Sequence, residues 1–379
     1  MLNDKHKNTI LMLLVGLLCT SLGLAVVFGS VTIPINTILL ALTPLNDHAN
    51  AAGFHNVADD NNIQLIIQKI RLPRALLAAL VGAVLGISGA VSQGLFRNPL
   101  ADPSLIGVSA GASIGATLVI FIGASRLFSE STNSPFFLNH TIGMSLVSIG
   151  AFVAALLTVM LVYHLSSSRY EGSGYGVNNS NRSSNTSVAT MLLAGIAMTA
   201  LASGLTNLME YASDSTALRR ISLWRMGGLD GATYTHVGLL FCVCIVVSYG
   251  VMRHSTTLNA LLLGESEARH LGIAVQKAKI QLIVLIAFGV GVCVAVSGGI
   301  GFIGLIVPHI MRLILGPNHR HLLPASALAG AILLLLADTI ARTILAPTEL
   351  PVGIITALIG APFFISLLRK RHRYGMQAA

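Results

Sequence analysis

Uncharged, apolar stretches of about 20 residues recur along this 379-residue chain, from Thr9 almost to its end. A stretch of this length crosses the hydrocarbon core of a bilayer as an α-helix, in which the backbone satisfies its own hydrogen bonds. Only 10% of the residues are charged, whereas soluble domains carry about 25%. We therefore predict an all-α polytopic membrane protein with one membrane domain, residues 1–379.

The uncharged runs predict about ten transmembrane helices. The stretch from Ile280 to Met311 is too long for one span, and the Ser297-Gly298-Gly299 sequence is the natural place to divide it. The predicted spans are Thr9–Gly29, Ala75–Phe96, Ser104–Gly123, Thr141–Tyr163, Thr190–Met209, Thr235–Met252, Ile280–Val296, Gly301–Leu315, Leu322–Thr343 and Val352–Leu368.

The distribution of basic residues predicts that both termini are cytoplasmic. With that orientation most lysines and arginines fall inside, chiefly in the tail 369–373, the loop 253–279 and the turn around Arg312. The net charge of +9 is then a signal of orientation. We expect no nucleic-acid partner, because no basic patch is interleaved with aromatic residues on a soluble surface.

Two connections differ in composition from the spans. Leu45–Lys69 contains several acidic residues and histidines and is predicted to be a solvated external loop. Residues 166–187 are rich in Ser, Asn and Gly, which predicts a flexible cytoplasmic insert. The single histidines His309, His319 and His321 fit solvated or helix-capping roles, so we predict no metal site.

Small residues recur at helical spacing in two predicted spans. Gly82, Gly86, Ala90 and Gly94 lie four residues apart, and so do Gly107, Gly111 and Gly115. Such ridges allow helix backbones to approach closely. They indicate a tightly packed bundle and say nothing specific about function.

The first informative motif runs from Arg71-Leu-Pro-Arg74 through the sequence GLFRNPLADPSLIGVSAGASIGA, which ends at Ala116. The polar residues Asn98 and Asp102 each directly precede a proline between two spans, so the helical hydrogen bonding is interrupted there. We predict a structured re-entrant turn in which Asn98 and Asp102 have structural roles.

The second motif is LNALLLGESEARHLGIAV, within a loop of about residues 255–276 on the predicted cytoplasmic side. It combines an apolar face with a charged stretch, and glycines terminate its two short helices, which suits docking to a soluble partner. A helix lying on the lipid headgroups is the alternative. The candidate docking residues are Leu258, Asn259, Gly264, Glu265, Glu267, Arg269 and Gly272.

The third motif, SGGIGFIGLIVPHIMR, places four glycines ahead of a proline between two spans. Regular helix is costly to maintain there, so we expect a hinge or a close backbone approach. The alternative is that the glycines only permit tight packing. The candidate pathway residues are Gly298, Gly299, Gly301, Gly304 and Pro308.

The fourth motif joins LLLLADTIART to ELPVGIITALIGAPFF. Asp338 and Arg342 are four residues apart on one predicted helix, where they can pair and reduce the cost of placing either charge in the membrane. A structural pair is the favoured reading of Asp338. A proton-relay carboxylate would instead fit an ion-gradient-driven secondary transporter.

Together these four motifs closely resemble the FecCD-type permeases, the family that imports iron siderophores, haem and cobalamin. The resemblance covers nearly the whole chain, apart from the 166–187 insert and the N-terminal external loop. It implies the type II fold of ATP-binding cassette (ABC) importer permeases, with ten spans per subunit. It also implies a homodimer with a translocation path on its two-fold axis and two ATP-binding cassette subunits beneath it.

The resemblance also implies the roles of particular residues. The loop Leu258–Gly272 matches the family's coupling loop, which contacts the ATPase. Arg71, Arg74 and Arg342 match external arginines that receive acidic residues of a periplasmic substrate-binding protein; for Arg71 and Arg74, ordinary helix-end snorkelling is the alternative. None of the six lysines follows a glycine, so the chain has no phosphate-binding G-K-[ST] motif.

We therefore expect a transport subunit without enzymatic activity or a bound cofactor, with ATP and Mg²⁺ held by the partner. The expected setting is the lipid of a bacterial inner membrane. The expected cargo is haem or a ferric siderophore, because RNPLADPSLIGVSAGA and GGLDGAT look more like haem permeases than cobalamin ones. A cobalamin permease of the same family and a secondary transporter are the alternatives.

Overall fold

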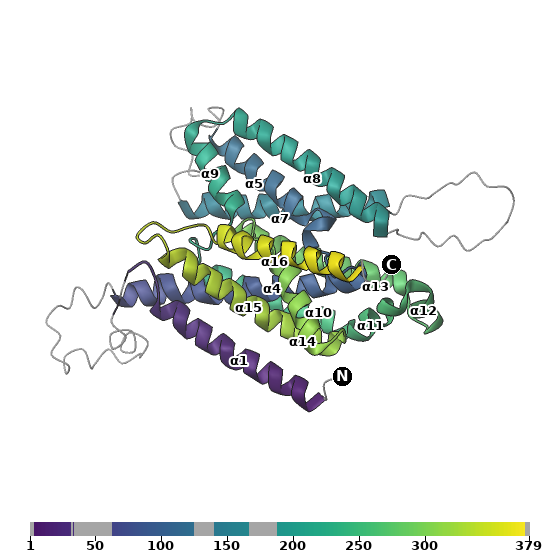
Figure 1. Ribbon diagram of the computed structural model, residues 1–379. Helices are drawn as coiled ribbons and strands as arrows, with labels where there is room; N and C mark the ends of the chain where they lie inside the picture. The colour runs from purple at the N-terminus through teal and green to yellow at the C-terminus, as the bar shows by residue number, and fades with distance from the viewer. Residues whose placement is uncertain (1–3, 32, 34–62, 125–139, 167–187, 376–379) are drawn as a thin grey trace, which may run out of the picture. The chain divides into compact units, whose positions relative to one another are not determined.

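The computed structural model describes residues 4–31, 33, 63–124, 140–166 and 188–375. In this part of the chain all regular structure is helical. Each of the ten predicted spans coincides with a helix, and Figure 1 shows them coloured along the sequence. The helices are α1 (Asp4–Val27), α4 (Leu72–Leu95), α5 (Val108–Ala124), α7 (His140–Ser166), α8 (Val188–Tyr211), α10 (Tyr234–Arg253), α13 (Val275–Ser297), α14 (Ile303–Leu315), α15 (His319–Thr343) and α16 (Val352–Gly375).

Among the described residues, seven helices are long and apolar enough to cross a membrane. The remaining three predicted spans contain shorter apolar segments, Val108–Gly123, Ile303–Leu315 and Val352–Leu367. α5 is short because the chain first forms a 3₁₀ turn, η2 (Pro103–Ile106), and α14 is short because Phe302 adopts a left-handed conformation just before it. The all-α polytopic prediction is confirmed.

The predicted external loop Leu45–Lys69 is wrong at its C-terminal end. Residues 34–62 lie outside the described part, but helix begins at Ile63 and continues without interruption to Leu95. Within it, η1 (Ile66–Arg71) is a π-helical segment. Lys69 and Arg71 broke the uncharged run in the sequence, so this extra helix was not recognised. The 166–187 insert also lies outside the described residues, apart from Ser166 at the end of α7.

The chain groups into two compact units, each built from separate stretches of sequence. The first unit contains Met1–Ala90, Met226–Tyr249 and Ile300–Ala379, and the second contains Val91–Arg225 and Gly250–Gly299. The boundary at Gly299 and Ile300 falls in the glycine-rich segment where the uncharged run was predicted to divide. The assignment of both units to a single permease domain stays a prediction.

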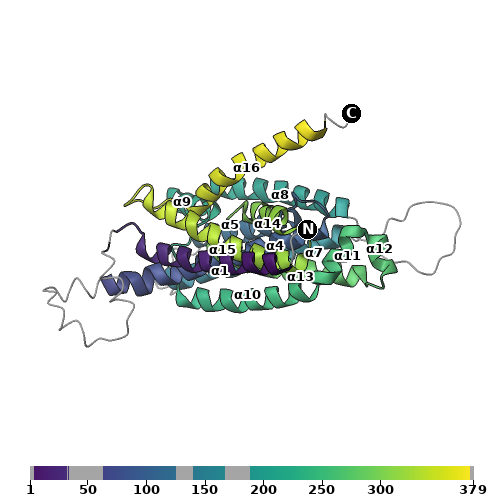
Figure 2. The same cartoon turned by 60° about the horizontal axis from the view of Figure 1, so that its bottom comes forward.

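In the first unit α15 packs against α1, α14 and α16. Figure 2 shows α1 running alongside α15, while α16 leaves α15 at an angle. Glycine makes the contact between α4 and α15 very close. A Cβ atom on Gly82 would lie 2.3 Å from the carbonyl oxygen of Gly330, and one on Gly86 would lie 2.2 Å from that of Ser326.

In the second unit α5 packs against α7, α8 and α13. Glycine again allows a close helix contact, because a Cβ atom on Gly115 would lie 2.1 Å from the carbonyl oxygen of Gly150 on α7. The prediction that the small-residue ridges permit tight packing is therefore confirmed in both units.

Two short helices, α11 (Ser255–Leu263) and α12 (Glu265–His270), precede α13 in the second unit and lie at its N-terminal end (Figure 2). They are the helix pair predicted from the second motif, and each ends just before the glycine that was predicted to terminate it. Gly264 has φ +124° between the two helices and Gly272 has φ +80° after α12, values that favour glycine.

One described helix, α9 (Ser215–Met226), was missed in the sequence. Its three arginines exclude it from a search for uncharged runs. The signal that identifies it is local: Asp214 accepts hydrogen bonds from the Thr216 hydroxyl and the Ala217 N–H, and Ala217 and Ile221 are buried one turn apart. These hydrogen bonds lower the pKa of the Asp214 carboxyl.

Candidate functional site

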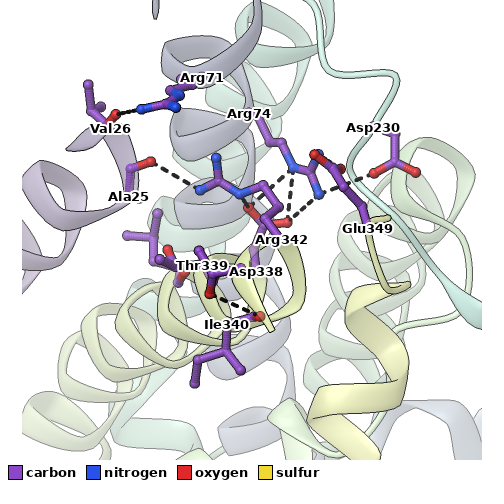
Figure 3. Close-up of polar contacts among 12 residues, drawn as sticks. Ala25, Val26, Arg71, Arg74, Asp230, Asp338, Thr339, Ile340, Arg342 and Glu349 are labelled. Carbon is purple, nitrogen blue, oxygen red and sulfur yellow. Dashed lines mark hydrogen bonds and ion pairs between the residues drawn. The ribbon is translucent and has the colours of Figure 1, made fainter. Parts of the chain in front are cut away.

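A network of three arginines and three carboxylates lies in the first unit, where α1 and α15 end and η1 passes into α4. The arginines are those predicted from the sequence, Arg71, Arg74 and Arg342, and Asp338 lies among them (Figure 3). The other two carboxylates, Asp230 and Glu349, come from the segments before α10 and α16. The sequence analysis assigned no role to either of these two.

Arg74 is the centre of the network. Its Nε donates to both oxygens of Asp338, at 3.0 and 3.2 Å, and its Nη2 lies 2.9 Å from Asp338 Oδ1. Nη1 donates to Glu349 Oε2 at 2.6 Å, and Nη2 lies 3.1 Å from Asp230 Oδ1. One guanidinium therefore binds three carboxylates, and two parallel bonds to Asp338 fix its plane.

The predicted pair of Asp338 and Arg342 is present, with 3.0 Å between Asp338 Oδ2 and Arg342 Nε. Its environment differs from the expectation, because Asp338 is shared between two arginines from helices far apart in sequence. The Asp338 side chain is only 1% exposed. A carboxylate bound on both sides by guanidiniums joins α4 to α15, which favours the structural role over a proton relay.

Arg71 and Arg342 also fasten the end of α1. Arg71 donates to the carbonyl oxygens of Val26 and Val27 at 2.9 and 2.8 Å and to that of Val31, and Arg342 donates to that of Ala25 at 3.0 Å. The last four carbonyls of a helix lack partners within the helix. Two cations therefore cap α1 and oppose the negative end of its dipole.

Arg71 and Arg74 do not lie beside solvent, although the family resemblance matches them to external arginines. Arg71, Arg74 and Arg342 are all buried, whereas the Asp230 side chain is 72% exposed and that of Glu349 is 30% exposed. Burial also argues against helix-end snorkelling, in which the charged heads would reach water. The solvent-accessible rim of the network is therefore acidic. Docking of a binding protein to these arginines stays a prediction.

The docking loop of the second unit buries part of the apolar face that the sequence assigned to a partner. Leu258 and Leu261 are buried within the unit, while Leu263 and Leu271 are exposed. Of the charged candidates, Glu267 and Arg269 are exposed, and Glu265 binds Lys279 with 2.5 Å between Oε1 and Nζ. Asn259 is partly buried on α11. The docking role of the loop stays a prediction.

The turn between α4 and α5 is structured as expected. Asn98 Oδ1 accepts from the N–H of Leu100 at 3.0 Å, and Asp102 Oδ1 accepts from that of Ser104 at 2.8 Å, capping η2. Burial raises the pKa of the Asp102 carboxyl, and the hydrogen bonds from Ser104 oppose that rise. Arg97, just before Asn98, takes a left-handed conformation with φ +50°.

The predicted pathway glycines differ in their backbone conformation and in their surroundings. Gly298 ends α13 with φ +67°, and a Cβ atom on Gly299 would lie 2.7 Å from the carbonyl oxygen of Arg225. In the first unit Gly304 lies against Gly89, on which a Cβ would be 1.9 Å from the Gly304 oxygen. Gly301 is exposed with no atom within 4 Å of its Cβ position. Close backbone approach is thus present at Gly299 and Gly304, and a hinge stays a prediction.

Pro308 lies inside α14, and the neighbouring His309 ring meets the Phe363 ring edge-on at 6.1 Å between centroids. Among the described residues, no group of three or more His, Cys, Asp or Glu side chains could hold a metal ion.

Comparison with known proteins places this geometry in context. Residues 13–370 match the model of the FecCD transport family. The chain is 41% identical over 344 residues to the hemin transport system permease protein HmuU of Yersinia pestis, covering 89% of this chain and 94% of that one. It is 41% identical over 310 residues to the vitamin B12 import system permease protein BtuC of Citrobacter koseri, covering 82% and 84%.

A solved structure of a metal-chelate type ABC transporter in an inward-facing conformation has the same fold. It superposes with a TM-score of 0.74 at 31% sequence identity, over 96% of this chain and 99% of that chain.

Proposed function

Because this chain belongs to the FecCD transport family and is a multi-pass permease of its ABC importers, we propose that it carries an iron chelate from the periplasm to the cytoplasm, with haem as the first candidate. The observation that supports haem is the extent of the match to the hemin permease, which covers 94% of that protein. A second candidate is cobalamin, because the vitamin B12 permease is equally similar in identity over a shorter region.

The energy source in this proposal is ATP hydrolysed by a separate subunit. The sequence has no glycine-lysine phosphate motif of its own. The working assembly would contain two copies of this chain, two ATP-binding cassette subunits and a periplasmic substrate-binding protein, in the inner membrane with both termini cytoplasmic. ATP binding by the partner would shift the population between outward-open and inward-open arrangements.

The two partners would meet different parts of the permease. The exposed side chains Glu267 and Arg269 of the α11–α12 loop would contact the ATPase. The network around Arg74 would meet the periplasmic binding protein, with Asp230 and Glu349 at its rim. An ion-gradient-driven transporter would require a carboxylate that gains and loses a proton during transport, whereas Asp338 forms ion pairs with two arginines that join α4 to α15.

Uptake in a strain lacking this permease tests the substrate assignment. The strain would carry the wild-type gene on a plasmid and receive labelled haem, a ferric hydroxamate or cobalamin in parallel. Haem uptake restored by the plasmid, with the other two at the level of the empty vector, is the expected result. Restored cobalamin uptake without haem uptake would replace haem by the second candidate.

A further inference from the structure

Lys279 is the one buried lysine in the described part of the chain, and the sequence analysis gave it no role. It lies in the second turn of α13, and its side chain is 4% exposed. Its Nζ donates to Glu265 Oε1 at 2.5 Å, and Glu265 is the first residue of α12. A buried ammonium is stable only when it is paired, so this contact fixes both partners.

The remaining contacts of α12 show what the pair adds. α12 has only six residues, too few to be stable as an isolated helix. Gly264 and Gly272 have positive φ and let the chain turn at both ends of α12. Ala268 is the residue of α12 that is buried. Among the described side chains, Glu265 and Lys279 form the ion pair that joins α12 to the long helix α13.

Several charged and apolar side chains of the loop are exposed within the second unit. Glu267, Arg269 and His270 on α12 are exposed, and so are the apolar side chains Leu263 and Leu271 on its flanks. This combination of apolar and charged groups is typical of a surface that meets another protein. Glu265 is partly buried: its Oε1 binds Lys279, and its Oε2 lies 3.9 Å from Arg269 Nη2.

We propose that Glu265 and Lys279 are positioning residues: their ion pair holds α12 on the end of α13 so that Glu267, Arg269 and the flanking leucines meet the ATPase in a fixed orientation. The proposal rests on the proposed function and revises one detail of the sequence-based reading, in which Glu265 itself contacted the ATPase. α13 runs from this pair to Ser297 and the glycine segment. The pair would therefore transmit movement of the docked ATPase to that helix.

Four variants test the pair: Glu265→Gln, Lys279→Met, the double variant with swapped charges (Glu265→Lys and Lys279→Glu), and the control Lys277→Met. Lys277 is two residues away on the same helix and is exposed. Each variant would be purified in nanodiscs. The measurements are amide hydrogen exchange of residues 265–271 and the Kd for the purified ATPase subunit.

Glu265→Gln and Lys279→Met should each speed amide hydrogen exchange in α12 and weaken ATPase binding roughly tenfold. The double variant with the two charges swapped should restore most of both properties, and Lys277→Met should match the wild type. If Lys279→Met fails to insert, Glu265→Gln still decides the question, because Glu265 is partly exposed and Lys279 is unchanged in this variant.

Two results would overturn the proposal. Glu265 would be a direct contact if Glu265→Gln bound the ATPase more weakly with unchanged amide hydrogen exchange in α12, and if the double variant with swapped charges did not restore binding. Identical behaviour of Lys279→Met and Lys277→Met would remove the role of the pair. Failure of the wild type to bind any ATPase would contradict the proposed function instead, and the exchange measurement would still report on the pair.

Discussion

Asp338 binds two arginines that reach it from different helices, so its removal affects more than one contact. In the variant Asp338→Asn the buried guanidiniums of Arg74 and Arg342 lose their shared anion. Breaking a buried ion pair by removing one partner costs about 3–5 kcal/mol. We predict a large fall in the thermal unfolding temperature of the purified protein, measured by intrinsic fluorescence, and lower abundance in the membrane.

Asp230→Asn is the matched control for that prediction. It removes a carboxylate from the same network, but at an exposed position, where ion pairs contribute about 1 kcal/mol or less. Its unfolding temperature should stay close to that of the wild type. If Asp338→Asn were as stable as Asp230→Asn but inactive in transport, the proton-relay alternative would be favoured over the structural role.

The acidic rim changes how the predicted docking to a binding protein should be tested. Reversing the charge of Arg71 or Arg74 would break the buried network, so a loss of binding would not identify a contact. Asp230→Asn removes a negative charge from the rim without burying an unpaired group. If the partner is acidic there, Asp230→Asn should accelerate its association.

Stopped-flow or surface-plasmon measurements of association with the binding protein would test this prediction. The wild-type rate should fall as the salt concentration rises, because complementary charge mainly accelerates encounter. A salt-independent wild-type rate, or slower association with Asp230→Asn, would contradict docking of acidic groups at Arg74.

Only the local part of the network could be predicted from sequence. Asp338 and Arg342 are one helical turn apart, so their pairing follows from helix geometry. Arg74 is 264 residues from Asp338, and its pairing depends on the packing of α4 against α15, which residue spacing does not reveal. Burial of the three arginines was missed for the same reason, since a charge next to a span is ordinarily solvated.

At the scale of elements, the contact between α4 and α15 depends on glycine. A side chain at Gly82 would collide with the backbone of Gly330, which cannot move without displacing the helix. We predict that Gly82→Leu destabilises the first unit by more than the ~1–3 kcal/mol usual for overpacking. The control is Gly23→Leu on α1, where no atom lies within 4 Å of the Cβ position.

The yield of folded protein after detergent extraction, measured by size-exclusion chromatography, would separate these two variants. Gly23→Leu should elute as the wild type does, and Gly82→Leu should aggregate or be degraded. Equal yields would show that α4 and α15 do not pack as closely as the structure indicates.

Gly301 allows a cleaner test of the pathway prediction than Gly304. A side chain at Gly304 would disturb the contact with Gly89, whereas Gly301 has open space. If the segment moves during transport, Gly301→Leu should lower uptake while leaving ATPase binding and thermal stability unchanged. Full uptake by Gly301→Leu would argue that the glycines serve packing alone.

The spans themselves were predictable because lipid imposes one simple requirement, an uncharged run of sufficient length. Elements that break that rule were harder to recognise. The helix that begins at Ile63 contains Lys69 and Arg71, and α9 contains three arginines, so neither could be found by hydropathy. α11 and α12 could be predicted from the sequence because Gly264 and Gly272 mark their C-terminal ends.

At the scale of the whole molecule, each unit carries one of the two predicted docking features. The first unit holds the arginine network, and the second holds the α11–α12 loop. In the proposed function, alternating access requires that events at these two features be coupled. Energy would enter only through the loop.

Uptake by reconstituted proteoliposomes tests this account most directly. Vesicles containing the permease and its ATPase would receive haem-loaded binding protein on the outside, with ATP, a non-hydrolysable analogue or an ionophore-collapsed ion gradient as separate conditions. We predict uptake that requires hydrolysable ATP inside and is unaffected by the ionophore. Uptake without ATP that disappears when the ion gradient is collapsed would contradict the account.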